Sequence, residues 1–83
     1  MPRYFIDTYD PSKVADEDGR ELPNIAAVRS LVRRSLLEIV AEEAHWKPSV
    51  RVRAVVRDEA GEQVMSATMQ VTTEWVGAGT QER

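Results

Sequence analysis

The chain has 83 residues and a mass of 9.4 kDa, which suits one domain whose folding buries roughly 60 to 65% of the unfolded surface. Its 42% hydrophobic and 30% charged residues are typical of a folded globular protein, and the absence of cysteine excludes disulfides and thiol nucleophiles. A net charge of −3 argues against a dedicated nucleic-acid-binding protein. No apolar run approaches the ~20 residues of a membrane span. We therefore expect a cytoplasmic protein that does not enter a membrane.

The first segment predicts a strand. Residues 3–9 combine aromatic and β-branched side chains, which favour extended structure. Turn signals follow at residues 10–12 and again at residues 16–19. The stretches after these turns, residues 13–15 and 20–22, can form only a short pairing with each other, and this pairing is an optional second strand.

A helix is predicted from about Ile25 to about His45. Asn24 is a suitable N-cap, and Pro48 disfavours helical geometry in the residue before it. At 100° per residue, one half of the helix is apolar, wide enough to cover a sheet, and contains Ile25, Val28, Leu31, Val32, Leu36, Ile39 and Val40.

Charges on this helix run from arginines in the first half to glutamates in the second, which opposes the helix macrodipole. Two interpretations stay open. The charges form a solvated face in which Arg34 pairs with Glu38, or the arginines form a patch for an acidic partner.

Two further strands are predicted after the helix. Apolar and polar residues alternate from Ser49 to Arg57 and again from Gln63, and residues 58–61 supply a turn between them. We place Ala54 opposite Met65, Val52 opposite Ala67 and Val50 opposite Met69, because this register brings the two apolar faces together. The last strand is expected to reach Val76, beyond what the preceding strand can pair.

These elements predict an α+β fold, in which a three- or four-stranded antiparallel sheet packs on one helix in the order β(β)αββ. Residues 1–76 form the single α+β domain. Residues 77–83 contain nothing to bury, and we expect them to form a flexible C-terminal tail.

Several motifs resemble those of a family of short bacterial proteins, the domain of unknown function 6894. The motifs are the opening Pro2-Arg3-Tyr4-Phe5-Ile6-Asp7, the segment Asp16-Glu17-Asp18-Gly19-Arg20-Glu21-Leu22-Pro23-Asn24 before Ala26-Ala27, and the turn Asp58-Glu59-Ala60-Gly61. Tyr9-Asp10-Pro11, Ser30, Val32 and a longer last strand depart from the family pattern. The resemblance implies an architecture and no activity. The β-β-α opening is also similar to that of HicB-type antitoxins, which is an analogy of fold only.

No residue pattern indicates an enzyme. His45 is the only histidine, and nucleophilic catalysis requires a base that a third group positions. Asp16 and Asp18 match the first two ligands of a calcium loop, but Arg20 and Glu21 stand where an oxygen ligand and a glycine belong. We therefore expect no catalytic residue, no metal site and no cofactor.

The face of the sheet that a single helix leaves uncovered is the predicted partner-binding surface. It is expected to have a small apolar centre with an arginine rim, made by Phe5, Val55, Val64, Arg51, Arg53 and Arg57. Because exposed rim charges contribute less than ~1 kcal/mol, Arg57→Ala is expected to have little effect on association with the partner.

These features favour a non-enzymatic protein-interaction module that presents its open sheet face or a strand edge to a protein partner or to a second copy as a dimer. One alternative is a nucleic-acid-binding module that stacks bases on Phe5 or Tyr4 beside the arginines. A HicB-like regulator, a small-ligand-binding protein and an unrecognised catalyst are further alternatives.

Overall fold

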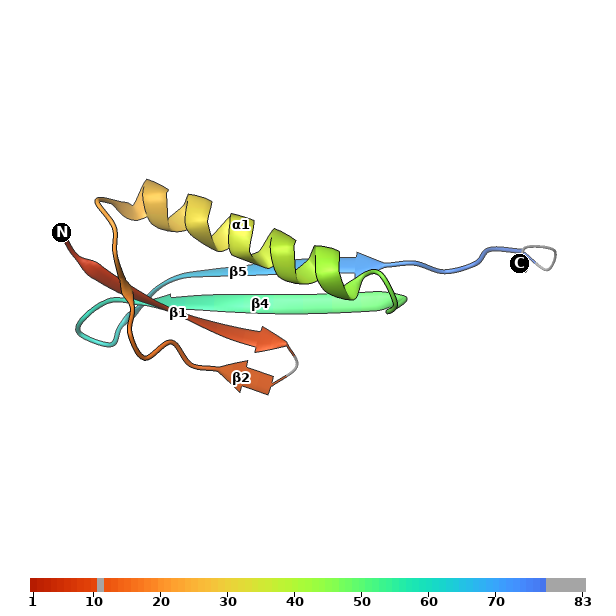
Figure 1. Cartoon of the computed structure of the whole chain (residues 1–83), viewed down its shortest axis with the longest axis horizontal. Helices are drawn as coiled ribbons and strands as arrows, with labels where there is room; N and C mark the ends of the chain where they lie inside the picture. The colour runs from red at the N-terminus through yellow and green to blue at the C-terminus, as the bar shows by residue number, and fades with distance from the viewer. Residues whose placement is uncertain (11, 78–83) are drawn as a thin grey trace.

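The computed structural model describes residues 1–10 and 12–77, and Figure 1 shows one helix over an antiparallel sheet. The elements are β1 (Arg3–Asp10), β2 (Ser12–Val14), β3 (Arg20–Glu21), α1 (Ile25–Glu43), β4 (Ser49–Arg57) and β5 (Gln63–Thr72). The predicted α+β fold is confirmed, with five strands in the order β-β-β-α-β-β. The predicted flexible tail lies, except for Gly77, outside the described residues.

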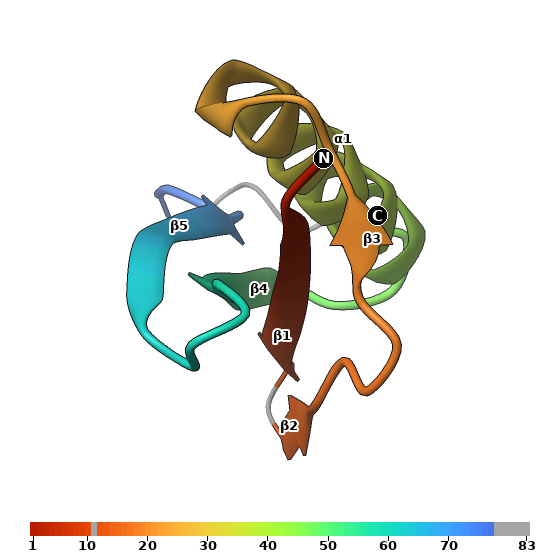
Figure 2. The ribbon, with the colours of Figure 1, turned by 90° about the vertical axis from the view of Figure 1, so that its left-hand side faces the viewer.

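The strands lie in the order β2-β1-β4-β5, and β3 also pairs with β1. Figure 2 shows the sheet with α1 on one face and with β5 and β2 at opposite margins. The predicted pairing between the two short segments is wrong, because each of them pairs with β1 instead. β1 has eight residues, so its outer edge is long enough to accept β2 at Thr8–Asp10 and β3 at Arg3 and Tyr4.

The helix begins where the sequence predicts. The side chain of Asn24 accepts a hydrogen bond from the N–H of Ala27 at 2.9 Å, which satisfies one amide of the first turn. The helix ends at Glu43, two residues earlier than predicted. The N–H groups of Trp46 and Lys47 both bond to the Glu43 carbonyl, so the chain turns here before Pro48.

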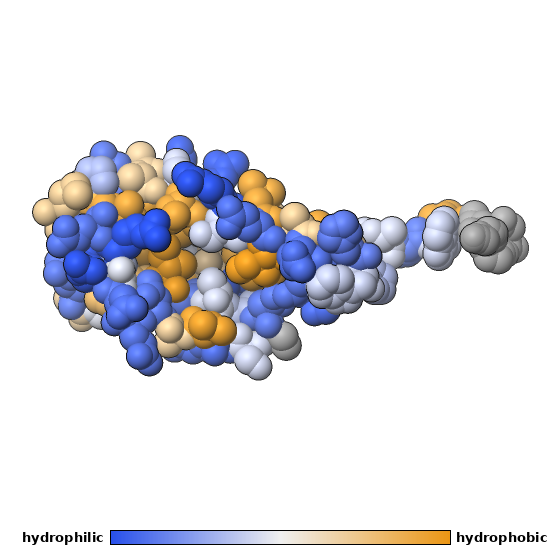
Figure 3. All heavy atoms as spheres, in the orientation of Figure 1, coloured by the Kyte–Doolittle hydropathy of each residue, from blue (hydrophilic) through white to orange (hydrophobic). Residues whose placement is uncertain are grey.

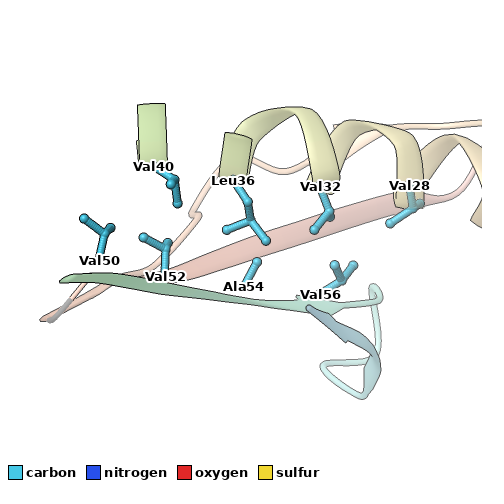
Figure 4. Close-up of a cluster of buried hydrophobic side chains, with 8 residues drawn as sticks. All are labelled: Val28, Val32, Leu36, Val40, Val50, Val52, Ala54 and Val56. Carbon is cyan, nitrogen blue, oxygen red and sulfur yellow. The ribbon is translucent and has the colours of Figure 1, made fainter. Parts of the chain in front are cut away.

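The core is a single layer between α1 and β4, as Figure 4 shows. Residues four apart on the helix meet residues two apart on the strand, because these spacings place side chains on one face of each element. The buried set is Val28, Val32, Leu36 and Val40 from α1, with Val50, Val52, Ala54 and Val56 from β4. The predicted inner face of β4 is confirmed. The predicted apolar stripe of the helix is confirmed for its central residues, but Ile25 at its start is 49% exposed, and Leu31 and Ile39 are only half-buried.

The predicted register of the β4–β5 hairpin is wrong by two residues. Ala54 pairs with Ala67, Val52 with Met69 and Val56 with Met65. The N–H of Asp58 bonds to the Glu62 carbonyl at 2.9 Å, and the ladder is irregular next to Arg57. The longer turn and the bulge shift the pairing, but a shift of two residues leaves the side chains from Met65 onward on their predicted faces.

The last strand is shorter than predicted. β5 ends at Thr72, which pairs with Ser49 at the start of β4. The N–H of Thr73 still bonds to the Pro48 carbonyl at 2.7 Å, but residues 73–76 belong to no strand. The expected unpaired excess of β5 over β4 is therefore absent from the described sheet. Across residues 1–10 and 12–77, no helix has the length and apolar character that crossing a bilayer requires.

Candidate functional site

The face of the sheet turned away from α1 brings together most of the predicted partner-binding residues. β4 presents Arg51, Arg53, Val55 and Arg57 on this face, because they alternate with the core residues of that strand. Phe5 of β1 lies opposite Arg57. The sixth residue, Val64, lies apart at the bulge of the hairpin, where its exposed fraction is 42%.

This face is not the exposed apolar patch that the sequence predicts. Val55, its expected centre, is only 2% exposed although α1 lies on the other face. Asp7 lies opposite Val55 in the neighbouring strand and is also 2% exposed. The centre of the face is therefore an aliphatic side chain beside a buried carboxylate, and neither of them is accessible to a partner.

Arg57 holds the Asp7 carboxylate in place. Its Nε and Nη2 donate to the two Asp7 oxygens at 2.8 and 3.1 Å, which is a bidentate ion pair. Nη2 also donates to the Asp16 carbonyl at 3.0 Å, and the Asp16 N–H donates to Asp7 Oδ1 at 2.9 Å. Arg57 is therefore not the free rim charge that the sequence predicts, because it joins β4, β1 and the loop after β2.

These contacts shift the acidity of both aspartates. The hydrogen bond from Arg57 lowers the pKa of Asp7, against the effect of burial, and the Asp16 N–H lowers it further. Burial acts to raise the pKa of Asp16, but the N–H groups of Gly19, Ile6 and Asp18 together hold it below its ordinary value. Both side chains therefore favour the ionised form in the folded protein.

Cations already cover the aromatic rings of this face. The guanidinium of Arg57 lies 5.1 Å from the centroid of Phe5. Arg53 and Lys13 lie 5.7 and 5.9 Å from the centroid of Tyr9. Such cation–π contacts stabilise the face internally, so an aromatic ligand could stack here only by displacing them.

The two aspartates that organise this region, Asp7 and Asp16, are not among the predicted site residues. Asp7 is the single charged residue within residues 4–9, and an acid inside such a strand is the signal that could have drawn attention to it. The sequence around Asp16 indicates only a turn residue or a calcium-loop mimic. Its carboxylate instead accepts the N–H of Ile6 at 3.0 Å and the N–H groups of Asp18 and Gly19.

These contacts cover the outer edge of β1 along its length. β2 pairs with one end, β3 pairs with the other, and the Asp16 carboxylate satisfies the Ile6 N–H between them. The covering strands have three and two residues, and they carry charged side chains at Lys13, Arg20 and Glu21. Short, charged strands protect a sheet margin against pairing with another chain.

The opposite margin has no such protection. β5 is the end strand of the sheet, and within residues 1–10 and 12–77 no strand pairs with its outer edge. Its sequence, QVMSATMQVT, contains no charged residue and no proline in ten positions. An extended edge of this kind presents unpaired N–H and C=O groups to any strand that approaches.

A groove runs beside this edge, between α1 and β5. It has a volume of about 430 Å³, and its apolar lining comes from the half-buried Met65, Ala67 and Met69 of β5 and from Val32 and Leu36 of α1. Ser66 and Thr68 also line it. Arg29 and Arg33 of α1 form the rim of this groove. We call the outer edge of β5 together with this groove the β5 margin.

The arginines of α1 therefore divide between two surfaces. Arg29 and Arg33 line the β5 margin, whereas Arg34 lies on the outer side of the helix and is exposed. In the part of the chain that the structure describes, Arg34 and Glu38 form no ion pair within 4.0 Å. The interpretation of the helix charges as a face held together by that pair is not supported.

The described residues contain no group of three or more His, Cys, Asp or Glu side chains that could hold a metal ion. His45 is exposed in the turn after α1, beside Trp46, and lines a shallow surface hollow with Thr73 and Trp75.

The fold and its margins define a small α+β domain with one covered and one open sheet edge. The chain matches the family model described as Domain of unknown function (DUF6894) over residues 3–70 of its 83. The chain therefore belongs to this family, as the sequence motifs suggest. Comparison with curated proteins and with solved structures gives no match.

Proposed function

We propose that this protein is a small, non-enzymatic interaction module that binds a protein partner by strand addition at the β5 margin. The observation that carries this proposal is the contrast between the two sheet edges. One edge is covered by β2, β3 and a carboxylate, whereas β5 has ten uncharged residues and its outer edge pairs with no strand of the described sheet.

The β5 margin has the two features that strand addition requires, a free strand edge and a neighbouring groove. Main-chain hydrogen bonds to the edge supply affinity, and a neighbouring pocket that accepts alternate side chains supplies specificity. The groove beneath α1 lies next to the inward-facing residues of β5, so every second side chain of an added strand would enter it.

The proposal is tested by charging the edge. Ser66→Glu/Thr68→Glu places two carboxylates on exposed positions of β5 without removing a core residue, and Thr68 lies opposite Arg53, which favours the fold. The full-length tagged protein is isolated from its natural host, and the proteins that it retains are compared. We expect the double variant to lose the partner and Arg51→Ala, on the open face, to keep it. Loss with Arg51→Ala and retention by the edge variant would refute the assignment of the β5 margin.

A nucleic-acid-binding function is the second candidate, because Phe5 and Tyr9 lie on the same face as the exposed Arg51 and Arg53. The other predicted stacking residue, Tyr4, packs instead against the core on the helix side of the sheet. The existing cation–π contacts and the net charge of −3 weigh against it. Fluorescence anisotropy with a labelled single-stranded oligonucleotide, repeated at rising salt, distinguishes the candidates. Salt-sensitive binding that Arg53→Ala abolishes would support nucleic-acid recognition.

A further inference from the structure

The middle of β5 is almost symmetric about Ala67. Met65-Ser66-Ala67-Thr68-Met69 reads nearly the same in both directions, with serine and threonine as the only exchanged pair. We infer that the occupant of the β5 margin is the β5 margin of a second copy, paired antiparallel about a two-fold axis at Ala67. This inference rests on the proposed function and names its partner.

Geometry restricts where such an axis can lie. A two-fold axis perpendicular to the sheet keeps both α1 helices on one face of a continuous sheet. Residues directly opposite each other in an antiparallel pair share a face, so the axis must pass through a residue and not between two residues. An axis at Ala67 places Met65 opposite Met69 of the second copy, and Ser66 opposite Thr68 of the second copy.

This pairing satisfies both faces of the strand. On the side of the helices, Met65, Ala67 and Met69 of each copy line that copy's groove, so the two grooves merge into one apolar strip. Methionine side chains are flexible enough to fill the joined space without a precise fit. On the other face, small hydroxyl side chains meet each other, and the strand brings no like charges together.

The helix arginines limit the strength of this association. Arg29 and Arg33 rim the groove in each copy, so pairing brings four cations toward the axis. Salt screens such repulsion, and the dimer is therefore expected to tighten as ionic strength rises. An acidic foreign strand at the same margin would be attracted by these arginines, and its binding would weaken with salt.

Cross-linking tests the axis directly, because the chain contains no cysteine of its own. In the Ala67→Cys variant, the two thiols at position 67 of the paired copies face each other across the axis. Their Cα atoms would be about 4.5 to 5.5 Å apart, which permits a disulfide. Ser12→Cys, on the exposed β2 strand at the other margin, is the matched control. We expect mild oxidation to convert Ala67→Cys to a covalent dimer at least about tenfold faster than Ser12→Cys.

A charge exchange tests the register. In Ser66→Glu/Thr68→Glu, carboxylates of the two copies face each other, whereas in Ser66→Lys/Thr68→Glu an ammonium faces a carboxylate on both sides of the axis. These variants differ only at position 66. We expect their dimer dissociation constants, measured by light scattering or sedimentation, to differ by about tenfold or more in favour of the mixed pair.

The wild-type chain is expected to approach twice its 9.4 kDa mass as concentration rises. If the measured mass remains that of a monomer at protein concentrations up to about 1 mM, where even a weak dimer would form, the inference is overturned. Equal cross-linking of the two cysteine variants also overturns it. If the chain is monomeric and the edge variant still loses a foreign protein from the host, the proposed function stands and the second copy is not the partner.

Discussion

At the scale of single residues, the pair formed by Asp7 and Arg57 dominates the sheet face away from α1. The two members differ in burial, since the Asp7 side chain is 3% exposed and the Arg57 side chain is 32% exposed. Removing the arginine leaves a buried carboxylate without its charged partner, whereas removing the aspartate leaves an arginine that water can still reach.

We therefore predict that Arg57→Ala is among the most destabilising changes on this face. The melting temperature is expected to fall by roughly 10 °C or more, because an unpaired buried charge is strongly unfavourable in a small domain. Arg53→Ala, which removes only a cation–π contact to Tyr9, is the control and is expected to lower it by a few degrees at most. Equal losses in thermal denaturation would contradict the role of the ion pair.

The lowered pKa of Asp7 gives this stabilisation a pH dependence. A carboxyl whose pKa is lower in the folded state than in the unfolded state stabilises the fold above the unfolded value of ~3.9. This contribution disappears as the pH falls through the folded value. Asp16 has a lowered pKa as well, so it loses its contribution in the same acidic range.

We predict that the melting temperature of the wild type falls steeply below about pH 5 and that Asp7→Asn has a shallower profile. The amide keeps the shape of the side chain but does not titrate, so its deficit is largest near neutral pH and narrows in acid. Parallel profiles from circular dichroism at matched salt would show that Asp7 is not the responsible group.

At the scale of elements, two loops each contain a glycine in the left-handed backbone conformation. Gly19 has a φ of 72° before β3, and Gly61 has a φ of 84° in the β4–β5 turn. A Cβ at Gly19 would lie 2.8 Å from Cε2 of Phe5 and 3.0 Å from Cγ of Arg3, whereas nothing lies within 4 Å of one at Gly61.

This difference separates backbone strain from crowding. Gly61→Ala is expected to lower the free energy of unfolding by about 1 to 2 kcal/mol, because alanine tolerates a positive φ less well than glycine does. Gly19→Ala has the same strain and must also displace the Phe5 ring, so its loss in free energy of unfolding is expected to be clearly larger. Denaturant titration of both variants measures the difference, and equal values would show that the Gly19 loop relaxes freely.

The elements also show which features the sequence could predict. Period and capping predict α1 and β4, because the apolar stripe and the Asn24 cap are local signals. The hairpin register is not local in the same way, since it depends on an Asp58–Glu62 closing bond and a bulge. β2 and β3 pair with the outer edge of β1. That edge depends on how β1 is placed in the folded sheet, which local sequence patterns do not contain.

The candidate site divides in the same manner. Alternation along β4 is enough to place Arg51, Arg53, Val55 and Arg57 on one face, and the structure agrees. Alternation cannot show that Asp7 of the neighbouring strand forms an ion pair with Arg57, or that Val55 is buried on that face. The openness of β5 follows from its position at the end of the strand order, which single-strand patterns do not contain.

At the scale of the whole molecule, the number of open edges decides what an edge-pairing protein can build. One open edge that pairs about a two-fold axis is used up in a dimer, so assembly stops there. Two open edges on each copy would allow the sheet to grow in both directions without closure. If β5 pairs as we infer, the cover over β1, which Asp16 holds in place, would stop assembly at the dimer.

Asp16→Ala should remove this limit, because it takes the acceptor from the Ile6 N–H and releases the loop between β2 and β3. We predict concentration-dependent species larger than a dimer, measured by sedimentation velocity. Asp58→Ala is the matched control, since the Asp58 carboxylate likewise accepts backbone N–H groups, those of Ala60 and Glu62, but in the hairpin turn away from the β1 edge. That variant is expected to lose stability without forming larger species. If both variants give the same size distribution, an exposed β1 edge does not pair with another chain. The β5 margin would then owe its pairing to something besides the lack of a covering strand.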